Sequence, residues 1–109
     1  MKEYKARIAD KILSRRLKSV GAVLIQGPKW CGKTTTAEQQ AQSVVYMDDP
    51  ELIAQNIELA ILSPKNLLAG ATPRLIDDWH LAPQLWAAAR FEIDHRDGMG
   101  HFIFTRSAV

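Results

Sequence analysis

Apolar residues follow two different periods in the first quarter of the chain. Between residues 3 and 17 they recur at helical spacing among basic residues, which predicts an amphipathic helix with its charges outward. The apolar positions of this helix are Tyr4, Ile8, Ile12 or Leu13, and Leu17. At residues 21–26 the period changes to a short β-branched run bounded by glycines, which is typical of a strand buried on both faces.

Three further strands are predicted, each after a stretch with helical spacing. They lie at residues 44–48, 73–78 and 101–105. Strands separated by helical segments of about ten residues form βαβ units, in which the strands are parallel and the crossovers right-handed. We therefore expect one α/β domain over residues 1–109, with three layers formed by a parallel sheet between helices.

The helices between these strands carry their own start signals. Asp49 before Pro50 is an N-cap acceptor followed by proline at the first helical position, and Ser63 before Pro64 repeats the signal for a short helix ending near Gly70. The first of these two helices continues with apolar residues at helical spacing: Leu52, Ile53, Ile57, Ala60 and Ile61. A helix from Pro83 is expected to turn inward Leu85, Trp86, Ala89 and Ile93, and a helix over residues 34–43 to turn inward Ala37 and Ala41.

Composition narrows the class of protein. With 109 residues, 47% hydrophobic and 24% charged, the chain fits one soluble globular domain and excludes a disordered segment. Its apolar runs are a few residues long, whereas a membrane span needs about 20, and no secretory stretch follows Met1. Cys31 is the only cysteine, so an internal disulfide and a thiolate metal site are excluded. We expect a cytoplasmic protein without a membrane partner.

The net charge of +2 conceals an asymmetry between the two parts of the chain. Residues 1–33 hold nine Lys or Arg against Glu3 and Asp10, a balance of +7, whereas the remaining 76 residues hold five Lys or Arg against ten Asp or Glu, a balance of −5. Two interpretations stay open for the basic part. It is either a solvated helix face or a surface that attracts nucleic acid or phosphate.

The strongest functional motif follows the first strand. Gly27-Pro28-Lys29-Trp30-Cys31-Gly32-Lys33-Thr34 fits G-x-x-x-x-G-K-[ST] without a mismatch, between a predicted strand and a predicted helix. The glycines let the backbone curl around a phosphate and expose N–H groups to it, and the helix N-terminus faces the same anion. Lys33 can place its ammonium on the β- and γ-phosphate oxygens, and the Thr34 hydroxyl can coordinate Mg²⁺.

The segment therefore predicts a nucleotide site. Its cofactor-binding residues are expected to be Gly27, Pro28, Lys29, Trp30, Cys31, Gly32, Lys33, Thr34 and Thr35. Thr35 would be an extra donor to the α-phosphate, and Cys31 is either a small loop filler or a thiol whose oxidation blocks phosphate binding. The alternative for the whole segment is a turn punctuated by glycine and proline, with a lysine at a helix start.

Two carboxylates end the strand that we expect beside the phosphate-loop strand. In Leu75-Ile76-Asp77-Asp78 an apolar run is followed by acids, as a phosphate-loop enzyme requires. Asp77 is assigned to Mg²⁺, through Thr34 or a bound water, and Asp78 to the polarisation of the attacking water. The alternative is that both carboxylates cap the turn that follows. His80 either packs or senses the γ-phosphate.

These residues together resemble the AAA-type phosphate-loop ATPases, and within them a prokaryotic group of ATP-binding proteins. The matching stretches are residues 24–35, 45–50, 75–86 and 100–107. The resemblance implies an ATP site with Mg²⁺, in which Lys33 and Thr34 hold phosphate and metal, Asp77 is the metal-side acid and Thr105 reads the γ-phosphate. Lys33, Asp78 and Thr105 are thus the catalytic candidates.

The chain departs from the family pattern at three points. Asp78 stands where the family has glutamate, so its carboxylate is about 1.3 Å shorter in reach, and a displacement near 1 Å can lose about 10²-fold in rate. Arg106 stands where the family has glycine, which puts a cation near the γ-phosphate. The family resembles a five-stranded sheet with a helical lid, and only four strands are predicted here. We therefore expect a segment from the N-terminal part of a longer ATPase, with residues 21–26 as an exposed apolar edge open to self-association.

The first hypothesis is accordingly an ATP-binding domain with slow Mg²⁺-dependent hydrolysis. A catalytically inactive nucleotide-binding remnant that serves as an interaction module is the second, and a nucleic-acid-binding piece that uses the basic helix is the third. A phosphate-loop kinase fits the motif alone, but no acceptor-substrate signature supports it.

Overall fold

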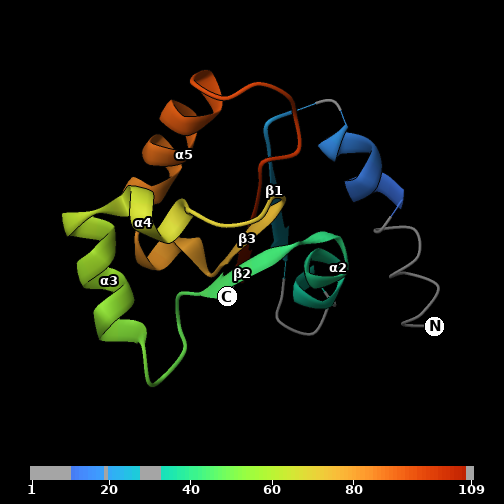
Figure 1. Cartoon of the computed structure of the whole chain (residues 1–109). Coiled ribbons are helices and arrows are strands. Elements are labelled where there is room, and N and C mark those ends of the chain that lie inside the picture. The colour runs from blue at the N-terminus through green and yellow to red at the C-terminus, as the bar shows by residue number, and fades with distance from the viewer. Residues whose placement is uncertain (1–10, 19, 28–32, 108–109) are drawn as a thin grey trace.

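The computed structural model describes residues 11–18, 20–27 and 33–107 (Figure 1). A helix at residues 11–17 precedes the other elements. These are β1 (Ala22–Gly27), α2 (Lys33–Gln40), β2 (Ser43–Tyr46), α3 (Ile53–Leu62), α4 (Pro64–Leu68), β3 (Arg74–Asp77), the 3-10 helix η2 (Trp79–Leu81), α5 (Gln84–Asp94) and β4 (Phe102–Ser107). Within the described residues, the alternation of strands and helices matches the predicted order, and the predicted part of the first helix before residue 11 lies outside them.

The four strands form one parallel sheet in the order β1-β4-β3-β2. The prediction of an α/β domain with a parallel sheet is confirmed. The prediction that the strand of Asp77 lies beside β1 is wrong, because β4 inserts between β1 and β3. Sequence periodicity identifies a strand, whereas its neighbours are chosen by packing between distant segments. Among the described strands, β1 pairs only with β4 and so forms one edge of the sheet.

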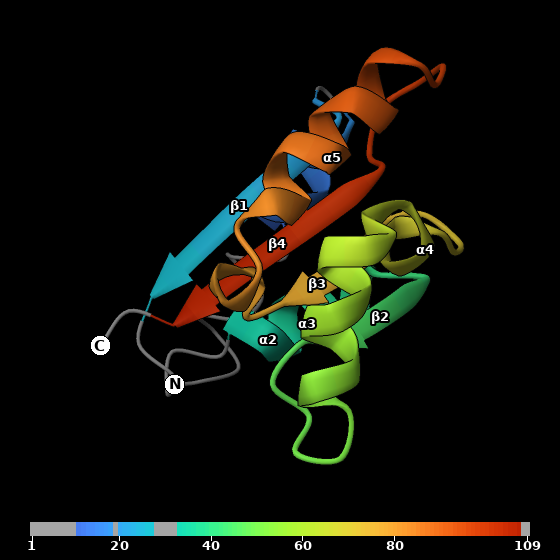
Figure 2. The same cartoon turned by 90° about the vertical axis from the view of Figure 1, so that its left-hand side faces the viewer.

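Helices cover both faces of this sheet (Figures 1 and 2). On the face that we call the α5 face, the buried residues come from α3, α4, α5, the strands β3 and β4, and the positions just after β2 and η2: Met47, Ala60, Leu67, Leu68, Ile76, Ala82, Leu85, Ala89, Phe102 and Phe104. On the α2 face, they come from the helix at residues 11–17, α2 and the strands: Leu13, Leu17, Val23, Ala37, Leu75 and Ile103. Successive residues of β3 and β4 alternate between these two cores, as the strand period of two requires.

The prediction that a helix starts at Asp49–Pro50 is wrong, because α3 begins at Ile53. The Asp49 Oδ1 atom accepts the Glu51 backbone N–H at 3.0 Å, and the Leu52 N–H donates to the Asp49 carbonyl at 2.9 Å. Asp49 therefore forms an Asx turn in front of the helix. This use of its side chain competes with N-capping of the helix. The apolar residues at helical spacing do not all face the core, since Asn56 and Ala60 are the buried residues of α3, whereas Leu52 and Ile61 are exposed.

Two other expected buried positions are exposed. Leu13 and Leu17 are the buried residues of the first helix, and Ile12 is 50% exposed. In β1, Val23 is buried but Leu24 is 38% exposed, so the prediction of a strand buried on both faces is wrong. The edge position of β1 explains this difference, because one side of an edge strand lacks a neighbour that would cover it. Among the described residues, no helix is long and apolar enough to cross a membrane.

Candidate functional site

The carboxyl ends of the parallel strands meet at one edge of the sheet, where the motif residues lie. β1 ends at Gly27, and α2 begins at Lys33. Residues 28–32 lie outside the described part of the chain, as do the side chains of Lys33 and Thr34. The backbone therefore confirms a strand before the motif and a helix after it, whereas the predicted phosphate contacts stay predictions. Thr35 lies in the first turn of α2 and is exposed.

A row of aligned residues crosses the sheet just before its carboxyl edge. Tyr46 of β2, Asp77 of β3 and Thr105 of β4 are register partners in turn. Leu75 and Ile103 belong to the α2-face core. Asp77 comes two residues after Leu75, and Thr105 two residues after Ile103, so Asp77 and Thr105 also lie on the α2 face.

A buried hydrogen bond joins two members of this row. The Thr105 hydroxyl donates to Asp77 Oδ1 at 2.5 Å, and Thr105 is fully buried while Asp77 is 7% exposed. A hydroxyl bonded to a carboxylate is a charge-assisted donor, which holds the carboxylate in one orientation. Thr105 thus orients Asp77 in this structure, and its predicted contact with a γ-phosphate stays a prediction.

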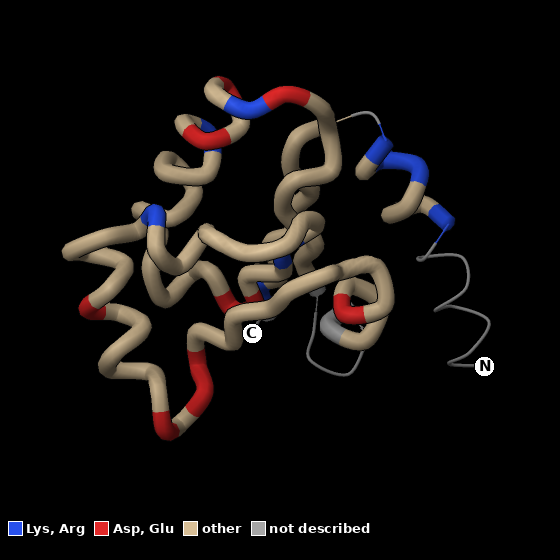
Figure 3. Tube along the Cα trace, in the orientation of Figure 1, with Lys and Arg blue, Asp and Glu red and all other residues tan. Residues whose placement is uncertain are grey.

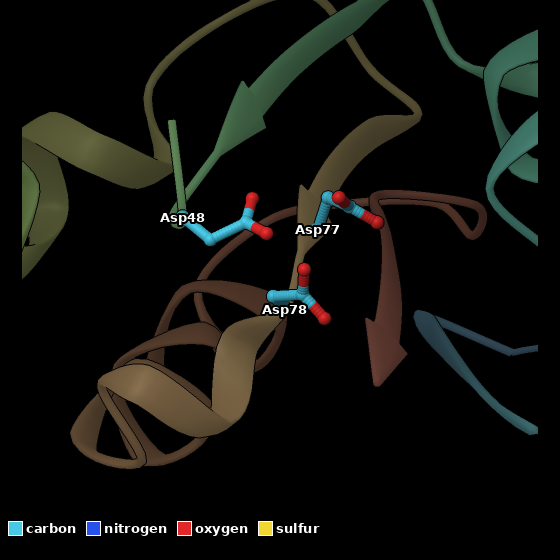
Figure 4. A group of neighbouring side chains, drawn as sticks. All are labelled: Asp48, Asp77 and Asp78. Atoms are coloured by element: carbon cyan, nitrogen blue, oxygen red, sulfur yellow. The ribbon is translucent and has the colours of Figure 1, made fainter. Parts of the chain in front are cut away.

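Asp77 of this row lies close to two other carboxylates. The three form what we call the acidic corner: Asp48, Asp77 and Asp78 (Figure 4). One oxygen from each lies within 4.8 Å of the others, and Asp77 and Asp78 are buried while Asp48 is exposed. All three offer oxygen ligands, the type that Mg²⁺ and Ca²⁺ prefer. The corner therefore has the donor set of a hard divalent cation and a local charge that a cation would neutralise.

Asp78 has a left-handed backbone, with φ 56° and ψ 47°. Aspartate and asparagine are the non-glycine residues that best tolerate this conformation. Asp78 stands at the N-cap position of η2, but its side chain makes no capping hydrogen bond. The alternative that this carboxylate caps the following turn is therefore wrong, and Figure 4 shows it in the acidic corner.

Asp48 is a member of the corner that sequence reasoning missed. It follows β2 by two residues, and the chain there is fixed by two hydrogen bonds. The Met47 N–H donates to the Asp77 carbonyl at 3.1 Å, and the Asn56 side-chain amide donates to the Tyr46 carbonyl at 3.1 Å. Its position just after a strand was the available signal, but only the pairing of β2 with β3 brings it to Asp77.

Tyr46 connects the end of β2 to α2. Its hydroxyl donates to the Glu38 carboxylate, and this hydrogen bond raises the pKa of Tyr46 from 10.0 to about 12, with burial and the charges of Glu38 and Asp77 acting in the same direction. Each of these effects disfavours a tyrosinate beside carboxylates. The contact ties the middle of α2 to the strand that leads to Asp48.

An aromatic cluster supports the acidic corner from the opposite face. Trp79 follows Asp78 directly, and its ring lies 5.4 Å from that of Trp86 and 6.0 Å from that of Phe104. The rings of Trp86 and Phe104 are 5.2 Å apart, which makes the three mutually packed. This packing holds η2 against the sheet and so fixes where the chain leaves Asp78.

The two remaining predicted neighbours of the site lie close to it. His80 is half-buried in η2, and among the described residues its buried Nδ1 atom has no hydrogen-bond partner. Arg106 is exposed at the carboxyl end of β4, in register with Gln26 of β1. The cation that departs from the family pattern is thus at the same edge as the motif.

Comparison of the chain with models of protein families, with curated proteins and with solved structures finds no match. What this edge of the sheet can bind follows from its own donors, charges and motif.

Proposed function

We propose that this domain binds ATP together with Mg²⁺ at the carboxyl edge of its sheet, and that it hydrolyses the nucleotide slowly. The observation that carries the proposal is the place of the acidic corner. Asp48, Asp77 and Asp78 gather at the same edge where β1 runs into the phosphate-loop motif and α2 starts at Lys33. A phosphate-binding segment beside hard oxygen ligands is the combination that a Mg²⁺–nucleotide complex requires.

The phosphate side of this proposal rests on the motif and its context. The N-terminus of α2 offers free N–H groups and the positive end of a helix dipole, which favour an anion. Residues 27–34 would wrap the phosphates, and Lys33 would add a positive charge to them. The choice of adenine over guanine rests on the family resemblance alone.

The metal side rests on the carboxylates. Asp77, held by Thr105, would be the metal-side acid with Thr34, and the newly found Asp48 would add a third carboxylate nearby. When bound, Mg²⁺ would neutralise phosphate charge that increases during the reaction.

Asp78 would be the base that polarises the attacking water. Its carboxylate is one methylene shorter than the glutamate of the family pattern, and it sits on a left-handed backbone that suits aspartate. A shorter reach places the base farther from the attacking water, so hydrolysis should be slow while binding persists. Binding without hydrolysis, the second hypothesis, is the limiting case of the same geometry.

A titration with a fluorescent ATP analogue tests the binding step. We expect wild type to bind more tightly with Mg²⁺ than without it, and Lys33→Ala to lose about 10-fold or more in affinity because a phosphate contact is removed. Lys65→Ala removes an exposed lysine in α4 and is the matched control. Equal affinities for wild type and Lys33→Ala would contradict the proposal. Competition by GTP measures the base preference.

A second variant tests the metal side separately. Asp77→Asn keeps the shape of the side chain and an acceptor for Thr105, but it removes the charge. We expect the Mg²⁺ dependence of nucleotide binding to fall by about 10–100-fold, the usual effect of altering a metal site, while affinity without Mg²⁺ is unchanged. An unaltered Mg²⁺ dependence would remove Asp77 from the metal site.

A further inference from the structure

A second charged feature lies away from the acidic corner, on the helix at residues 11–17. Ser14 and Arg15 lie three and four residues after Lys11, and Lys18 lies four and three residues after them, so the four residues share one side of the helix. Together with Gln40 of α2 they line an open groove of about 420 Å³. The three cations are exposed, whereas Ser14 and Gln40 are half-buried.

The packing of this helix explains why its basic side faces outward. Leu13 and Leu17 are buried in the α2-face core, where Ala37 of α2 also lies. The apolar side of the helix is therefore occupied by the domain itself, which leaves the basic side outward beside α2. Figure 3 shows several basic positions and no acidic one on the described part of this helix, whereas the rest of the domain carries both kinds.

The chemistry of the groove favours a phosphate ligand. None of its five lining residues is acidic, and the sequence from residue 11 to residue 28, before the phosphate-loop lysines, holds four Lys or Arg and no Asp or Glu. Arginine and lysine bind phosphate oxygens through charge, and hydroxyl and amide side chains add neutral hydrogen-bond donors. A membrane surface is disfavoured, because the apolar side that would enter the lipid is already buried.

The length of the groove distinguishes a polymer from a single nucleotide. Lys11 and Lys18 are seven residues apart, about 10 Å along a helix, and one strand of duplex DNA has a phosphate about every 3.4 Å of its axis. Gln40 is at the far end of α2 from Lys33, about 10 Å away along the helix axis. The groove therefore spans several phosphates and is separate from the proposed ATP site.

We infer that this groove, formed by Lys11, Ser14, Arg15, Lys18 and Gln40, binds the phosphodiester backbone of a nucleic acid. The inference does not rest on nucleotide binding. Its contacts are charges and simple donors, so it binds the backbone without reading base sequence. Three cations each neutralising one phosphate predict a logarithmic salt slope of about −2.7 from this groove, or a loss of about 40-fold in affinity when salt rises fourfold.

Fluorescence anisotropy with the full chain and a labelled 20-base-pair DNA tests this inference, at about 50 mM and 200 mM salt. The triple change Lys11→Gln, Arg15→Gln and Lys18→Gln should remove most of the salt dependence. The control is Arg16→Gln, Lys65→Gln and Arg90→Gln, which removes the same charge at exposed positions outside the groove and should retain it. Absence of DNA binding by wild type at the lower salt would overturn the inference, and so would an equal loss in the control.

A single change on α2 tests the contribution of Gln40 to DNA binding separately from that of the first helix. Gln40→Glu puts a negative charge in the groove and should weaken DNA binding by several-fold, whereas Gln39→Glu puts the same charge on the exposed neighbouring position and should have little effect. Duplex RNA and vesicles of phosphatidylserine and phosphatidylcholine are further arms. Binding to the vesicles without binding to either nucleic acid would overturn the inference. Lys33→Ala should leave DNA affinity unchanged, which keeps this test distinct from that of ATP binding.

Discussion

The two faces of the sheet are built from the same strands but differ in what covers them. Among the described residues, the α5-face core holds ten buried residues, including Phe102 and Phe104, and Trp79 and Trp86 pack against it. The α2-face core holds six buried residues, all aliphatic. The α2 face also carries the hydrogen bond from Thr105 to Asp77, the contact of Tyr46 with Glu38 and the basic groove. Large apolar side chains thus gather on one face and polar chemistry on the other.

The alternation of side chains along a strand explains how this division arises. At the end of β4, Phe104 points into the α5-face core and Thr105 lies on the α2 face; at the end of β3, Ile76 and Asp77 are divided in the same way. Each strand therefore anchors itself with one residue and presents a functional group with the next. The packing of the α5 face therefore holds rigid the residues that the same strands present on the α2 face.

The largest expected effect is loss of the aromatic anchor on the α5 face. Phe104→Ala should lower the free energy of unfolding by about 3–5 kcal/mol, because Phe104 is fully buried and contacts both Trp79 and Trp86. This is a large share of the roughly 5–15 kcal/mol that holds a domain folded. Urea denaturation measures it, with Phe91→Ala as the control at a 62% exposed position. A loss below about 1 kcal/mol would contradict the view that the α5 face anchors the sheet.

A matched pair of leucines compares the two cores directly. Leu85→Ala on the α5 face should cost about 3–5 kcal/mol, and Leu17→Ala on the α2 face about 2–3 kcal/mol, since the smaller core around Leu17 can relax more easily. Both residues are helical, so the change in helix propensity is the same. Urea midpoints with constant slopes give the difference. A larger cost at Leu17 would reverse our view of which face stabilises the domain.

Lengthening the carboxylate at position 78 tests the chemistry of the acidic corner. Asp78→Glu should speed phosphate release from ATP, by up to about 100-fold, because the base gains reach towards the attacking water. Its left-handed backbone should make the same variant slightly less stable than wild type. Asp78→Asn keeps the backbone preference, removes the base and should release no phosphate. An unchanged rate for Asp78→Glu would show that reach does not limit hydrolysis.

The smallest expected effect concerns the pH dependence of the Tyr46 contact. Because the folded protein raises the pKa of Tyr46 to about 12, the stability from this group is fully present below pH 10 and is lost as pH rises towards 12. Ultraviolet titration of tyrosinate should show a component near pH 12 that Tyr46→Phe removes and Glu38→Gln moves back towards 10. A tyrosinate titration unaffected by Glu38→Gln would mean that Glu38 does not hold α2 to β2.

Sequence patterns predicted the site in part. The apolar run before Asp77 and Asp78 placed both carboxylates at the end of a strand, and the structure has them there. The pattern could not show that Thr105 would bond Asp77, because residues 77 and 105 meet only when β4 inserts beside β3. Asp48 joins the acidic corner because β2 pairs with β3, which is likewise a contact between segments distant in the sequence. The helix start at Asp49 failed because the same side chain favours a cap and a turn, and local sequence does not choose between them.

Three features of this protein follow from its amino-acid sequence: the alternation of strands and helices, the motif between β1 and α2, and the concentration of positive charge before residue 34. These features are local, since periodicity, glycine spacing and charge are properties of neighbouring residues. Three others arise from tertiary contacts: the strand order, the gathering of Asp48, Asp77 and Asp78, and the position of the basic helix beside Gln40 of α2. Those features depend on contacts between residues distant in sequence, which are chosen by burial of the whole apolar surface at once.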